Sequence, residues 1–508
     1  AKIDSYGING LEAYPVTVEV DVANGLPSMV IVGLPDSAVR ESKERVRSAV
    51  KNSGYKFSPQ RITVNLSPAD IKKEGSSFDL AISLGIIAAT GQIEPSLLKE
   101  FIVLGQLSLD GTIQPVSGAL TIALSLPKNT YKGIILPAVN AAEAAVASHT
   151  PVYPVRTLSE VIHFLTAQNS LEPLKVDINN LFQNAQAYDT DFSDVKGQAF
   201  VKRGLEVAAA GGHNVLMIGP PGSGKTMLAK RLATILPGMT LEESLETTKI
   251  HSVMGLLSAH KGLIASRPFR SPHHTSSDVA LVGGGSVPRP GEITLSHNGI
   301  LFLDELPEFN RNVLESLRQP LEDHHVTIAR ASKSLRFPSR FMLVGAMNPC
   351  PCGNYGNPRV ACRCSPAQIQ KYRSKISGPL LDRIDIHLDV PAVNFPELSA
   401  SIPSESSAQI KERVNKARAI QLERFKYENI FGNAQMSHKQ VRKFCALGKE
   451  ESELLKMAMT ELNFSARAFD KILKGSRTIA DLEGSEQIKT EHLAEAIQYR
   501  SLDRDWWG

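Results

Sequence analysis

A glycine-rich stretch between two apolar segments constrains the fold of this chain more than any other feature. Residues 219–226 are Gly-Pro-Pro-Gly-Ser-Gly-Lys-Thr, which matches the pattern G-x-x-x-x-G-K-[ST]. The apolar run 214–218 before it predicts a buried strand, and 227–232 after it predicts a helix. Such a turn directs backbone N–H groups and the positive end of the helix dipole to one point. The stretch therefore predicts a phosphate-binding loop.

The side chains of this loop suit a nucleoside triphosphate with Mg²⁺. Lys225 would reach the β- and γ-phosphates, and the Thr226 hydroxyl would ligate Mg²⁺. The alternative is a Gly/Pro-rich turn without a ligand, but every fixed position of the pattern is matched. We therefore predict that ATP or GTP binds at Gly219, Pro220, Pro221, Gly222, Ser223, Gly224, Lys225 and Thr226.

Two further apolar runs end in polar side chains that suit the same site. Residues 299–303 predict a strand that leads into Asp304 and Glu305. Asp304 would hold Mg²⁺ through its water shell, and Glu305 would polarise the attacking water. The alternative is a buried strand followed by acidic surface residues. A third apolar run, 341–347, ends at Asn348, although an Asn-Pro pair often simply starts a turn.

Composition and charge limit the class of protein. The chain has 508 residues, of which 42% are hydrophobic and 21% charged, as in globular domains with a large core. Because the net charge is only +4, any contact with nucleic acid depends on local basic patches. No apolar stretch of about 18 residues and no basic-then-apolar leader is found, so we expect a cytoplasmic protein that does not bind membranes.

Changes in composition divide the chain into three parts. Strand-like and helix-like runs alternate over 1–170, which predicts an α/β domain, and the polar segment 171–190 predicts a linker. Residues 191–392 contain the phosphate-binding loop. A Pro/Ser-rich linker at 393–410 precedes 411–508, where the pattern has a helical period. The predicted fold class is α/β with a carboxy-terminal helical domain.

Four of the five cysteines lie close together in the sequence. They form two Cys-x-Cys pairs, Cys350 with Cys352 and Cys362 with Cys364, across a loop rich in Gly, Asn and Pro. Four thiolates are the usual ligands of a structural zinc ion, although this spacing is tighter than usual. The alternative is a loop of reduced thiols. Zinc here would brace the segment that follows Asn348.

The order of the motifs resembles an AAA+ ATPase module. Besides the loop and the acidic strand, the module includes Asn348, Leu-Leu-Asp-Arg-Ile-Asp at 380–385 and Ser-Ala-Arg at 465–467. Residues 267–275 and 283–293 resemble the magnesium-chelatase-related subgroup. The amino-terminal part looks like the ribosomal-S5-type fold of the Lon protease catalytic domain. Together these features are similar to the ComM/YifB family, whose members are described as hexameric helicases that drive branch migration during natural transformation.

This resemblance implies roles for three polar side chains. Asn348 would be the sensor that orients the attacking water. Arg383 would be the arginine finger that reaches the γ-phosphate of a neighbouring subunit, and Arg467 the arginine of the helical lid. An always-charged planar guanidinium suits contact with phosphate. The alternative for Arg383, which follows Asp382, is a surface ion pair.

The same resemblance places Ser77 where Lon-type proteases have their nucleophile. Leu120, however, stands at the position of the catalytic lysine. Because a serine without a base is not activated, we expect no proteolysis and interpret Ser76 and Ser77 as loop and helix-capping hydroxyls. We expect this domain to serve assembly or DNA contact.

Two inserted segments are candidates for DNA contact. Residues 326–337 alternate like a hairpin, with Arg330 and Lys333 near its tip. In related helicases a hairpin at this place enters the pore of the ring, where Lys333 would grip phosphates. The alternative is an ordinary solvated hairpin with charged edges. The segment 280–292, with Arg289, is either a second pore loop or a long turn.

The resemblance therefore implies a ring-shaped, homo-hexameric DNA helicase that uses ATP and Mg²⁺, and its cysteines suggest zinc as well. Its partners would be single-stranded and branched DNA and recombination proteins. The alternative class is a chelatase-like ATPase that remodels a protein partner. His273 and His274 have no metal-like partners nearby in the sequence, so we expect them to have a structural or interface role.

Overall fold

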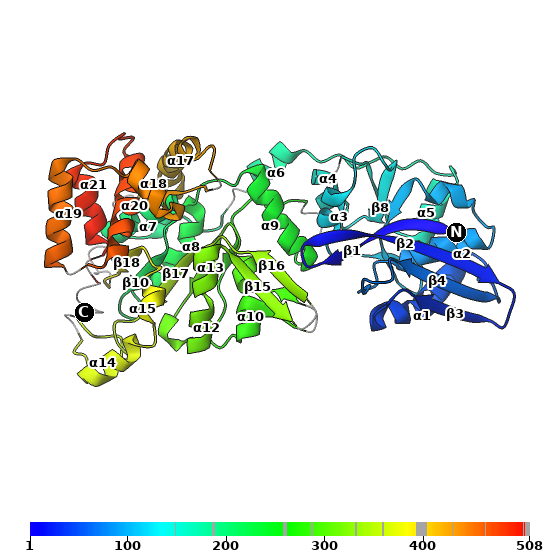
Figure 1. Ribbon diagram of the computed structural model, residues 1–508, viewed down its shortest axis with the longest axis horizontal. Helices are drawn as coiled ribbons and strands as arrows, with labels where there is room; N and C mark the ends of the chain where they lie inside the picture. Colours follow the sequence, from blue (N-terminus) through cyan, green and yellow to red (C-terminus); the bar gives the residue numbers. More distant parts are fainter. Residues whose placement is uncertain are drawn as a thin grey trace. The chain divides into compact units, whose positions relative to one another are not determined.

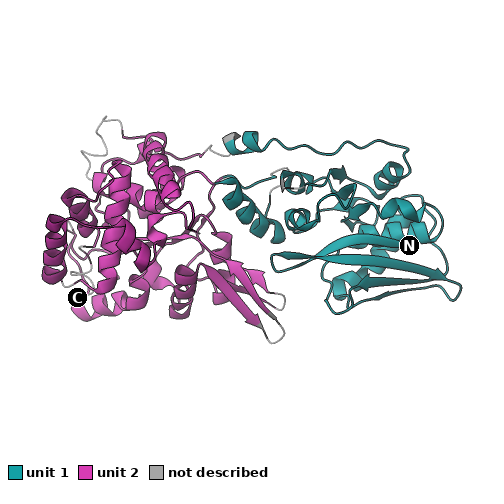
Figure 2. Cartoon of the chain, turned by 45° about the horizontal axis from the view of Figure 1, so that its top comes forward, with its two compact units in different colours: residues 1–186, 240–265 teal, residues 187–239, 266–508 magenta. Residues whose placement is uncertain are grey.

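The chain forms two compact units, which Figure 2 shows in different colours. The structure, a computed structural model, describes residues 1–147, 149–184, 188–257, 262–285, 288–330, 333–357, 360–392, 404–428, 430–462, 464–500 and 502. The first unit consists of residues 1–186 and 240–265, and the second of residues 187–239 and 266–508. Residues 240–265 thus belong to the first unit, although they follow the phosphate-binding loop in the sequence.

A seven-stranded mixed sheet, in the order β3-β4-β2-β1-β5-β8-β9, forms the centre of the first unit. Strands β1, β2 and β4 pair antiparallel, and the other pairings are parallel. Alternate residues of β2, such as Val16, Val18 and Val20, are buried, as the period of two predicts. The strands of the unit are β1 (Lys2–Asn9), β2 (Glu12–Ala23), β3 (Ser28–Val32), β4 (Arg61–Ser67), β5 (Phe101–Val103), β6 (Gln106–Leu107), β7 (Ile113–Gln114), β8 (Gly133–Pro137) and β9 (Val152–Val155).

The helices of the first unit include one that comes from the inserted segment 240–265. They are α1 (Ser37–Asn52), α2 (Asp79–Ala89), η1 (Pro95–Leu98), α3 (Ala119–Ser125), α4 (Ala141–Ala147), α5 (Leu158–Leu165), α6 (Ile178–Asn184) and α9 (Leu241–Val253). The Gly118 N–H, at the start of α3, donates to the Ser252 carbonyl in α9 over 3.0 Å. A Cβ on Gly262 would lie only 2.8 Å from the Ala142 carbonyl oxygen, so this segment packs closely on α4.

The predicted cap of α2 is wrong. The helix begins after Phe78, and no side chain caps it. The backbone carbonyls of Ser76 and Ser77 instead accept hydrogen bonds from the N–H groups of Asp79 (3.2 Å) and Gly105 (2.9 Å). Asp79 in the first turn places a carboxylate at the positive end of the helix dipole, which offsets the missing cap.

A five-stranded parallel sheet, in the order β11-β14-β17-β10-β18, forms the centre of the second unit. Its strands are β10 (Val215–Ile218), β11 (Phe269–Arg270), β14 (Ile300–Leu303), β17 (Met342–Met347) and β18 (Ile386–Asp389). The first of them along the chain, β10, lies between β17 and β18, which come last. Strands β11, β14 and β17 lie on one side of β10 and β18 lies on the other. Ligands of such sheets bind at the carboxyl ends of the strands, at the point where the strand order reverses.

Two small hairpins are added to the second unit. The strands β12 (Gly283–Gly284) and β13 (Arg289–Pro290) form one, and β15 (His325–Arg330) and β16 (Lys333–Pro338) form the other. Figure 1 shows the β15–β16 hairpin projecting from the unit. The shorter helices here are α10 (Asp278–Val282), α11 (Glu292–Leu295), η3 (Leu306–Glu308), α12 (Arg311–Ser316), α13 (Arg318–Asp323), α14 (Pro366–Arg373) and α15 (Gly378–Leu381).

A carboxy-terminal group of helices packs on the same core as the five-stranded sheet. Helix α17 contacts α7, α8 and α20, and α20 contacts α7 and α21 (Figure 1). The carboxy-terminal helices are α17 (Ser407–Arg424), η4 (Asn433–Gln435), α18 (His438–Phe444), α19 (Lys449–Glu461), α20 (Ala466–Leu482) and α21 (Thr490–Gln498). The helices of this unit that come earlier in the chain are η2 (Phe192–Asp194), α7 (Ala199–Gly211) and α8 (Lys225–Ile235). Within the described part of the chain, no helix has the length and apolar character needed to cross a membrane.

Candidate nucleotide-binding site

The phosphate-binding loop joins β10 to α8, and its backbone requires glycine. Gly222 and Gly224 have φ values of 76° and 92°, where other residues are strained. The loop is folded around Lys225, the first residue of α8, whose Nζ lies 2.8 Å from the Gly219 carbonyl and 3.0 Å from the Pro220 carbonyl. Burial lowers the pKa of Lys225, and the nearby carboxylates of the acidic strand oppose this effect. A buried cation that the loop carbonyls hold at the start of a helix is suited to an anionic ligand.

The two acidic residues follow β14, next to this loop. The Thr226 hydroxyl donates to Asp304 Oδ2 over 2.6 Å, and the Glu305 N–H donates to Asp304 Oδ1 over 3.0 Å. The Thr226 and Asp304 oxygens are therefore adjacent, and Mg²⁺ binds oxygen ligands of this kind beside substrate phosphates. The donor set fits the cation that the sequence predicts.

Asn348 follows β17, the strand between β14 and β10. Its Oδ1 lies 3.3 Å from Lys225 Nζ. The carboxyl ends of three neighbouring parallel strands thus bring Lys225, Glu305 and Asn348 to one edge of the sheet. The sequence predicts each of these residues separately, and the order of the strands places them together.

Glu305 has a partner that the sequence analysis did not assign. The Nδ1 atom of His274 lies 3.2 Å from Glu305 Oε2, and the rings of His273 and His274 are 4.2 Å apart. Strand β11 pairs with β14, so the chain beyond β11 reaches the end of the acidic strand. Glu305 itself has a φ of 53°, a left-handed conformation that a non-glycine residue adopts at some cost. No sequence pattern links two residues that are neighbours only across the sheet.

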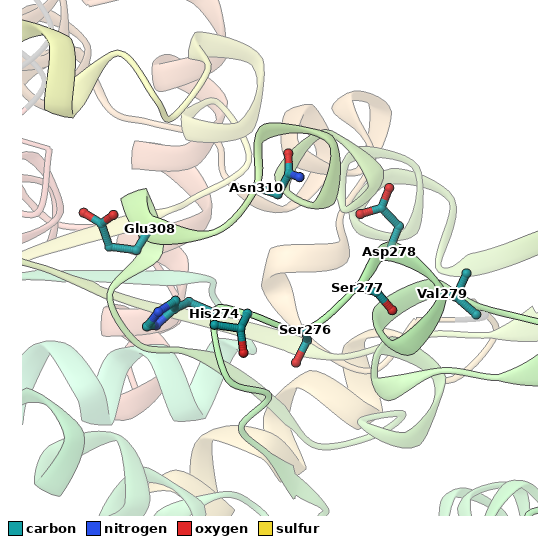
Figure 3. Close-up of a pocket in the computed structure, with 8 residues that line it drawn as sticks. His274, Ser276, Ser277, Asp278, Val279, Glu308 and Asn310 are labelled. Carbon is teal, nitrogen blue, oxygen red and sulfur yellow. The ribbon is translucent and has the colours of Figure 1, made fainter.

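A pocket of about 690 Å³ opens beside this His274–Glu305 pair. Figure 3 shows His274 and Glu308 toward one side of it and Asp278 and Asn310 toward the other. Hydroxyl groups of Thr275, Ser276 and Ser277 also belong to its lining. The pocket is open and its lining is about half polar, so water has access to the imidazole that contacts Glu305.

Arg383 and Arg467 form ion pairs at the carboxyl side of α15 and the start of α20. Arg383 pairs with Glu322 of α13, and Arg467 pairs with Asp382. Burial lowers the pKa of Arg383, and nearby positive charges lower it further. Among the described residues, neither arginine forms a hydrogen bond or ion pair with the phosphate-binding loop. Within one chain, Arg383 and Arg467 are therefore held in ion pairs. For either arginine to contact the nucleotide, a second copy of the chain must supply it or helix α20 must move.

A polar network connects the chain beside Arg383 to the sheet and to helix α20. The Asn214 side chain donates to the Arg383 carbonyl over 2.8 Å and accepts from the Leu343 N–H over 2.8 Å. The Asp385 carboxylate accepts from the Asn214 N–H over 3.0 Å and lies 3.2 Å from Lys471 Nζ of α20. Burial alone would raise the pKa of Asp385, but Lys471 and other nearby cationic groups hold it well below the ordinary value. Asn214 therefore connects the β10, β17 and Arg383 segments.

The four clustered cysteines come together in space. Their sulfur atoms lie within 4.8 Å of one another, with Cys350 Sγ 3.4 Å from Cys352 Sγ and 3.7 Å from Cys362 Sγ. A tetrahedral zinc ion with Zn–S bonds of about 2.3 Å holds its sulfurs about 3.8 Å apart, so Cys350, Cys352, Cys362 and Cys364 fit such an ion. The loop also touches the phosphate-binding loop, because a Cβ on Gly353 would lie 2.4 Å from Pro221 Cδ.

The predicted basic residues lie on the two hairpins. Arg330 ends β15 and pairs in register with Lys333, which begins β16. The side chains of these two residues, and Ser332 between them, lie outside the described part of the structure. In the other hairpin, Arg289 is exposed and pairs with Gly284. A hairpin fold was predicted for 326–337, and the strand pairing is as expected.

The fold and site define the class of protein as an AAA+ P-loop ATPase of the magnesium-chelatase type. Three family models match the chain: magnesium chelatase, subunit ChlI, at residues 191–398; subunit ChlI of Mg-chelatase at 18–140; and the ChlI carboxy-terminal model at 404–500. This family implies ATP and Mg²⁺ as ligands, which agrees with the donor set around Lys225 and Asp304.

Full-length relatives define the family more narrowly. The competence protein ComM of Haemophilus influenzae is 45% identical over 97% of this chain and 96% of its own length. Protein YifB of Escherichia coli is 44% identical over 97% of this chain and 96% of its own length. The chloroplastic magnesium-chelatase subunit ChlI of Nicotiana tabacum is 21% identical over 64% of this chain and 76% of its own length. The chain belongs to the ComM/YifB family.

Proposed function

We propose that this protein is an ATP-driven DNA translocase that works as a ring, with six subunits by the family resemblance, and promotes branch migration during natural transformation. The observation that carries the proposal is the β15–β16 hairpin, inserted between the acidic strand β14 and the sensor strand β17. A hairpin at this position moves with the residues that hold the nucleotide. The similarity to the competence protein ComM supports DNA as the substrate.

In this proposal the residues around β10 bind ATP and activate water. Lys225 offsets the charge of the β- and γ-phosphates, and the oxygens of Thr226 and Asp304 hold Mg²⁺, which when bound neutralises phosphate charge. Glu305 accepts the proton of the attacking water, and Asn348 orients that water. Arg383 of a neighbouring subunit and Arg467 of the lid would complete the site, once each leaves its ion pair.

The test is ATP turnover with and without single-stranded and four-way-junction DNA. The blank is Glu305→Gln, and Glu308→Gln is the matched control because it removes a nearby carboxylate outside the proposed set. We expect DNA to stimulate turnover strongly, and Glu305→Gln to abolish it. Lys333→Ala should weaken DNA binding similarly for all sequences, because a phosphate contact carries no sequence information. If DNA does not change the rate of ATP turnover and Lys333→Ala does not change DNA binding, the translocase is ruled out.

A protein-remodelling ATPase is the second candidate. It is favoured by the magnesium-chelatase family models, which together match most of the chain. A chelatase-like subunit acts on a protein partner, so its turnover would depend on Glu305 but not on DNA. The same assay therefore separates the two candidates.

We further propose that Cys350, Cys352, Cys362 and Cys364 bind a structural zinc ion. The mutual sulfur distances support it, and the Tyr355 N–H donates to Cys350 Sγ over 3.3 Å, as expected for a thiolate ligand. Elemental analysis should find about one zinc per chain, which Cys362→Ser should lower and Cys445→Ser should not. Absence of zinc from gently purified protein would disprove this site.

Four broader proposals come from the sequence pattern and the family resemblance. The amino-terminal part, 1–170, is an S5/Lon-like domain without protease activity, and 411–508 is a helical lid on the core 191–392. The protein works in the cytoplasm. Its partners there include other recombination proteins.

A further inference from the structure

The segment between α1 and β4 combines basic and aromatic residues. It reads Lys-Asn-Ser-Gly-Tyr-Lys-Phe-Ser-Pro-Gln-Arg over 51–61. Tyr55 and Phe57 are partly buried and pack against the core of the first unit, whereas Lys51 and Lys56 are exposed. Interleaved lysines and aromatic rings are typical of surfaces that bind single-stranded nucleic acid, where rings stack on bases and lysines meet phosphates.

These residues line a pocket of about 760 Å³ in the first unit. Its walls come from the end of α1, the loop that follows, β2 and the end of α2. The lining contains two lysines and no acidic residue: Val22, Lys51, Gly54, Tyr55, Lys56, Phe57, Ser58, Pro59, Gln60, Ala89, Thr90 and Gln92. A pocket of this volume suits one or two bases, and its charge suits an anion.

The loop of the pocket is held in shape before any ligand binds. The Gln92 side chain accepts from the Lys56 N–H and donates to the Lys56 carbonyl, each over 2.8 Å. The Gln60 side chain accepts from the Ser58 hydroxyl and donates to Asn24, also over 2.8 Å each. A preformed loop has less conformational entropy to lose on binding, which favours a ligand site over a loose surface turn.

A row of basic residues on α1 leads to the pocket. Arg40, Lys43, Arg47 and Lys51 follow a spacing of three or four residues, so they share one helix face. Within the described part of the chain, none of the four has a salt bridge, although Glu44 lies at the edge of the same face. Unpaired cations along a helix that ends at an aromatic pocket form a path for a phosphate backbone.

We propose that this pocket binds single-stranded DNA, with a base stacked on Tyr55 or Phe57 and the adjoining phosphates on Lys51, Lys56 and the α1 row. The choice of DNA as the polymer rests on the proposed function. The chemistry of the site, an aromatic platform beside cations, does not. The first unit would thus hold one strand independently of the β15–β16 hairpin.

The test uses the full chain with Lys333→Ala, so that the hairpin does not dominate binding. The probe is a fluorescent oligo-dT of 20 nucleotides. It is compared with an abasic probe, which has the same sugar–phosphate backbone without the bases. Lys51→Ala combined with Lys56→Ala should lower the salt dependence, d log K/d log [salt], by about 1.4, because each phosphate contact contributes about 0.7 on single strands. The control, Lys128→Ala with Lys175→Ala, removes two exposed lysines outside the pocket and should leave binding unchanged.

Stacking is tested separately. We expect oligo-dT to bind about tenfold more tightly than the abasic probe, and Tyr55→Leu combined with Phe57→Leu to abolish that preference. Because these substitutions also change core packing, a second measurement uses the unaltered rings: an oligonucleotide with 5-iododeoxyuridine should photocrosslink to residues 54–58. Equal binding of both probes, or crosslinks confined to the second unit, would overturn the site while leaving the translocase proposal intact. No DNA binding by the unmodified chain would instead remove the proposed function as well.

Discussion

At the scale of single residues, His274 contacts Glu305, the residue that we propose accepts the proton of the attacking water. The imidazole lies 3.2 Å from Oε2, so one of the two carboxylate oxygens that could accept a proton from water is already in contact with a side chain. In this arrangement His274 competes with water for Glu305. A nucleotide or a neighbouring subunit that draws His274 away would free the carboxylate. The pocket of Figure 3 gives the room for such a displacement.

Replacing His274 should therefore loosen the control of turnover. We expect His274→Ala to raise DNA-independent ATP turnover several-fold and to reduce the ratio of DNA-stimulated to basal turnover. His273→Ala is the matched control, because His273 stacks on His274 without the contact to Glu305. Steady-state ATPase assays with and without DNA measure both quantities. A His274→Ala variant whose basal turnover falls would show instead that the imidazole supports Glu305 in the reaction.

At the scale of secondary-structure elements, helix α20 holds the chain beside Arg383 through Lys471. The ammonium donates to the Ile384 carbonyl over 2.7 Å as well as pairing with Asp385. Both side chains are largely buried, with 11% and 14% of their surface exposed, so solvent screens the pair only weakly. Helix α20 and the five-stranded sheet are therefore joined at the residues next to the proposed arginine finger.

Breaking one half of this pair should free the lid. Lys471→Met leaves the Asp385 carboxylate buried without its cation, a change that costs about 3 kcal/mol. We expect faster hydrogen–deuterium exchange in α20 and β18 of this variant. Combining it with Asp385→Asn removes the unpaired charge, so exchange in the double variant should be slower than in Lys471→Met alone. If the two variants exchange equally fast, the pair does not hold the lid.

The pKa of Asp385 gives this junction a pH dependence. Its folded-state pKa lies well below the ordinary 3.8, so the unfolded chain binds more protons as the pH falls through that value. The stability that the pair contributes is therefore complete above about pH 4 and is lost progressively below it. Thermal melts from pH 6 to pH 3 should show a smaller loss of stability in Asp385→Asn than in the unmodified protein. An identical pH profile would contradict this assignment.

At the scale of the whole molecule, the chain leaves the nucleotide-binding unit after α8, builds α9 into the first unit, and returns at residue 266. Helix α8 begins with Lys225 of the phosphate-binding loop, and only a short segment separates its end from α9. Along the chain, the loop is therefore followed closely by a segment of the first unit. The first unit is thus incomplete without a segment that belongs to the other part of the sequence.

A fragment of residues 1–186 should consequently be less stable than the same fragment with 240–265 attached through a short linker. We expect a difference in thermal midpoint of about 5 °C or more, since about 1 kcal/mol shifts the midpoint of a domain of this size by 2–4 °C. The matched control carries Gly262→Leu in the attached segment, where a side chain would meet the Ala142 carbonyl. Equal midpoints for both fragments would show that α9 adds no stability.

The local features of this protein follow directly from its residues. The periods of apolar residues predicted the strands at 215–218, 300–303 and 342–347 and the β15–β16 hairpin, because side-chain burial follows backbone geometry. The spacing G-x-x-x-x-G-K-T predicted the phosphate-binding loop, because left-handed glycines and a helix start are local requirements. The resemblance to the ComM/YifB family also came from motifs in order along the chain, and the full-length relatives confirm it.

Which distant residues come into contact depends on how the whole chain packs. The strand order places His274 against Glu305 and Asn348 against Lys225, and it assigns α9 to the first unit. Those contacts depend on how strands pair and helices pack across large separations in sequence, which no local period encodes. The prediction of a serine cap on α2 was wrong for the same reason. No side chain caps the helix, and the Leu80 N–H in its first turn donates to the Gly105 carbonyl instead. The sequence identifies the residues that can bind the nucleotide, whereas the packing of the strands brings them together into one site.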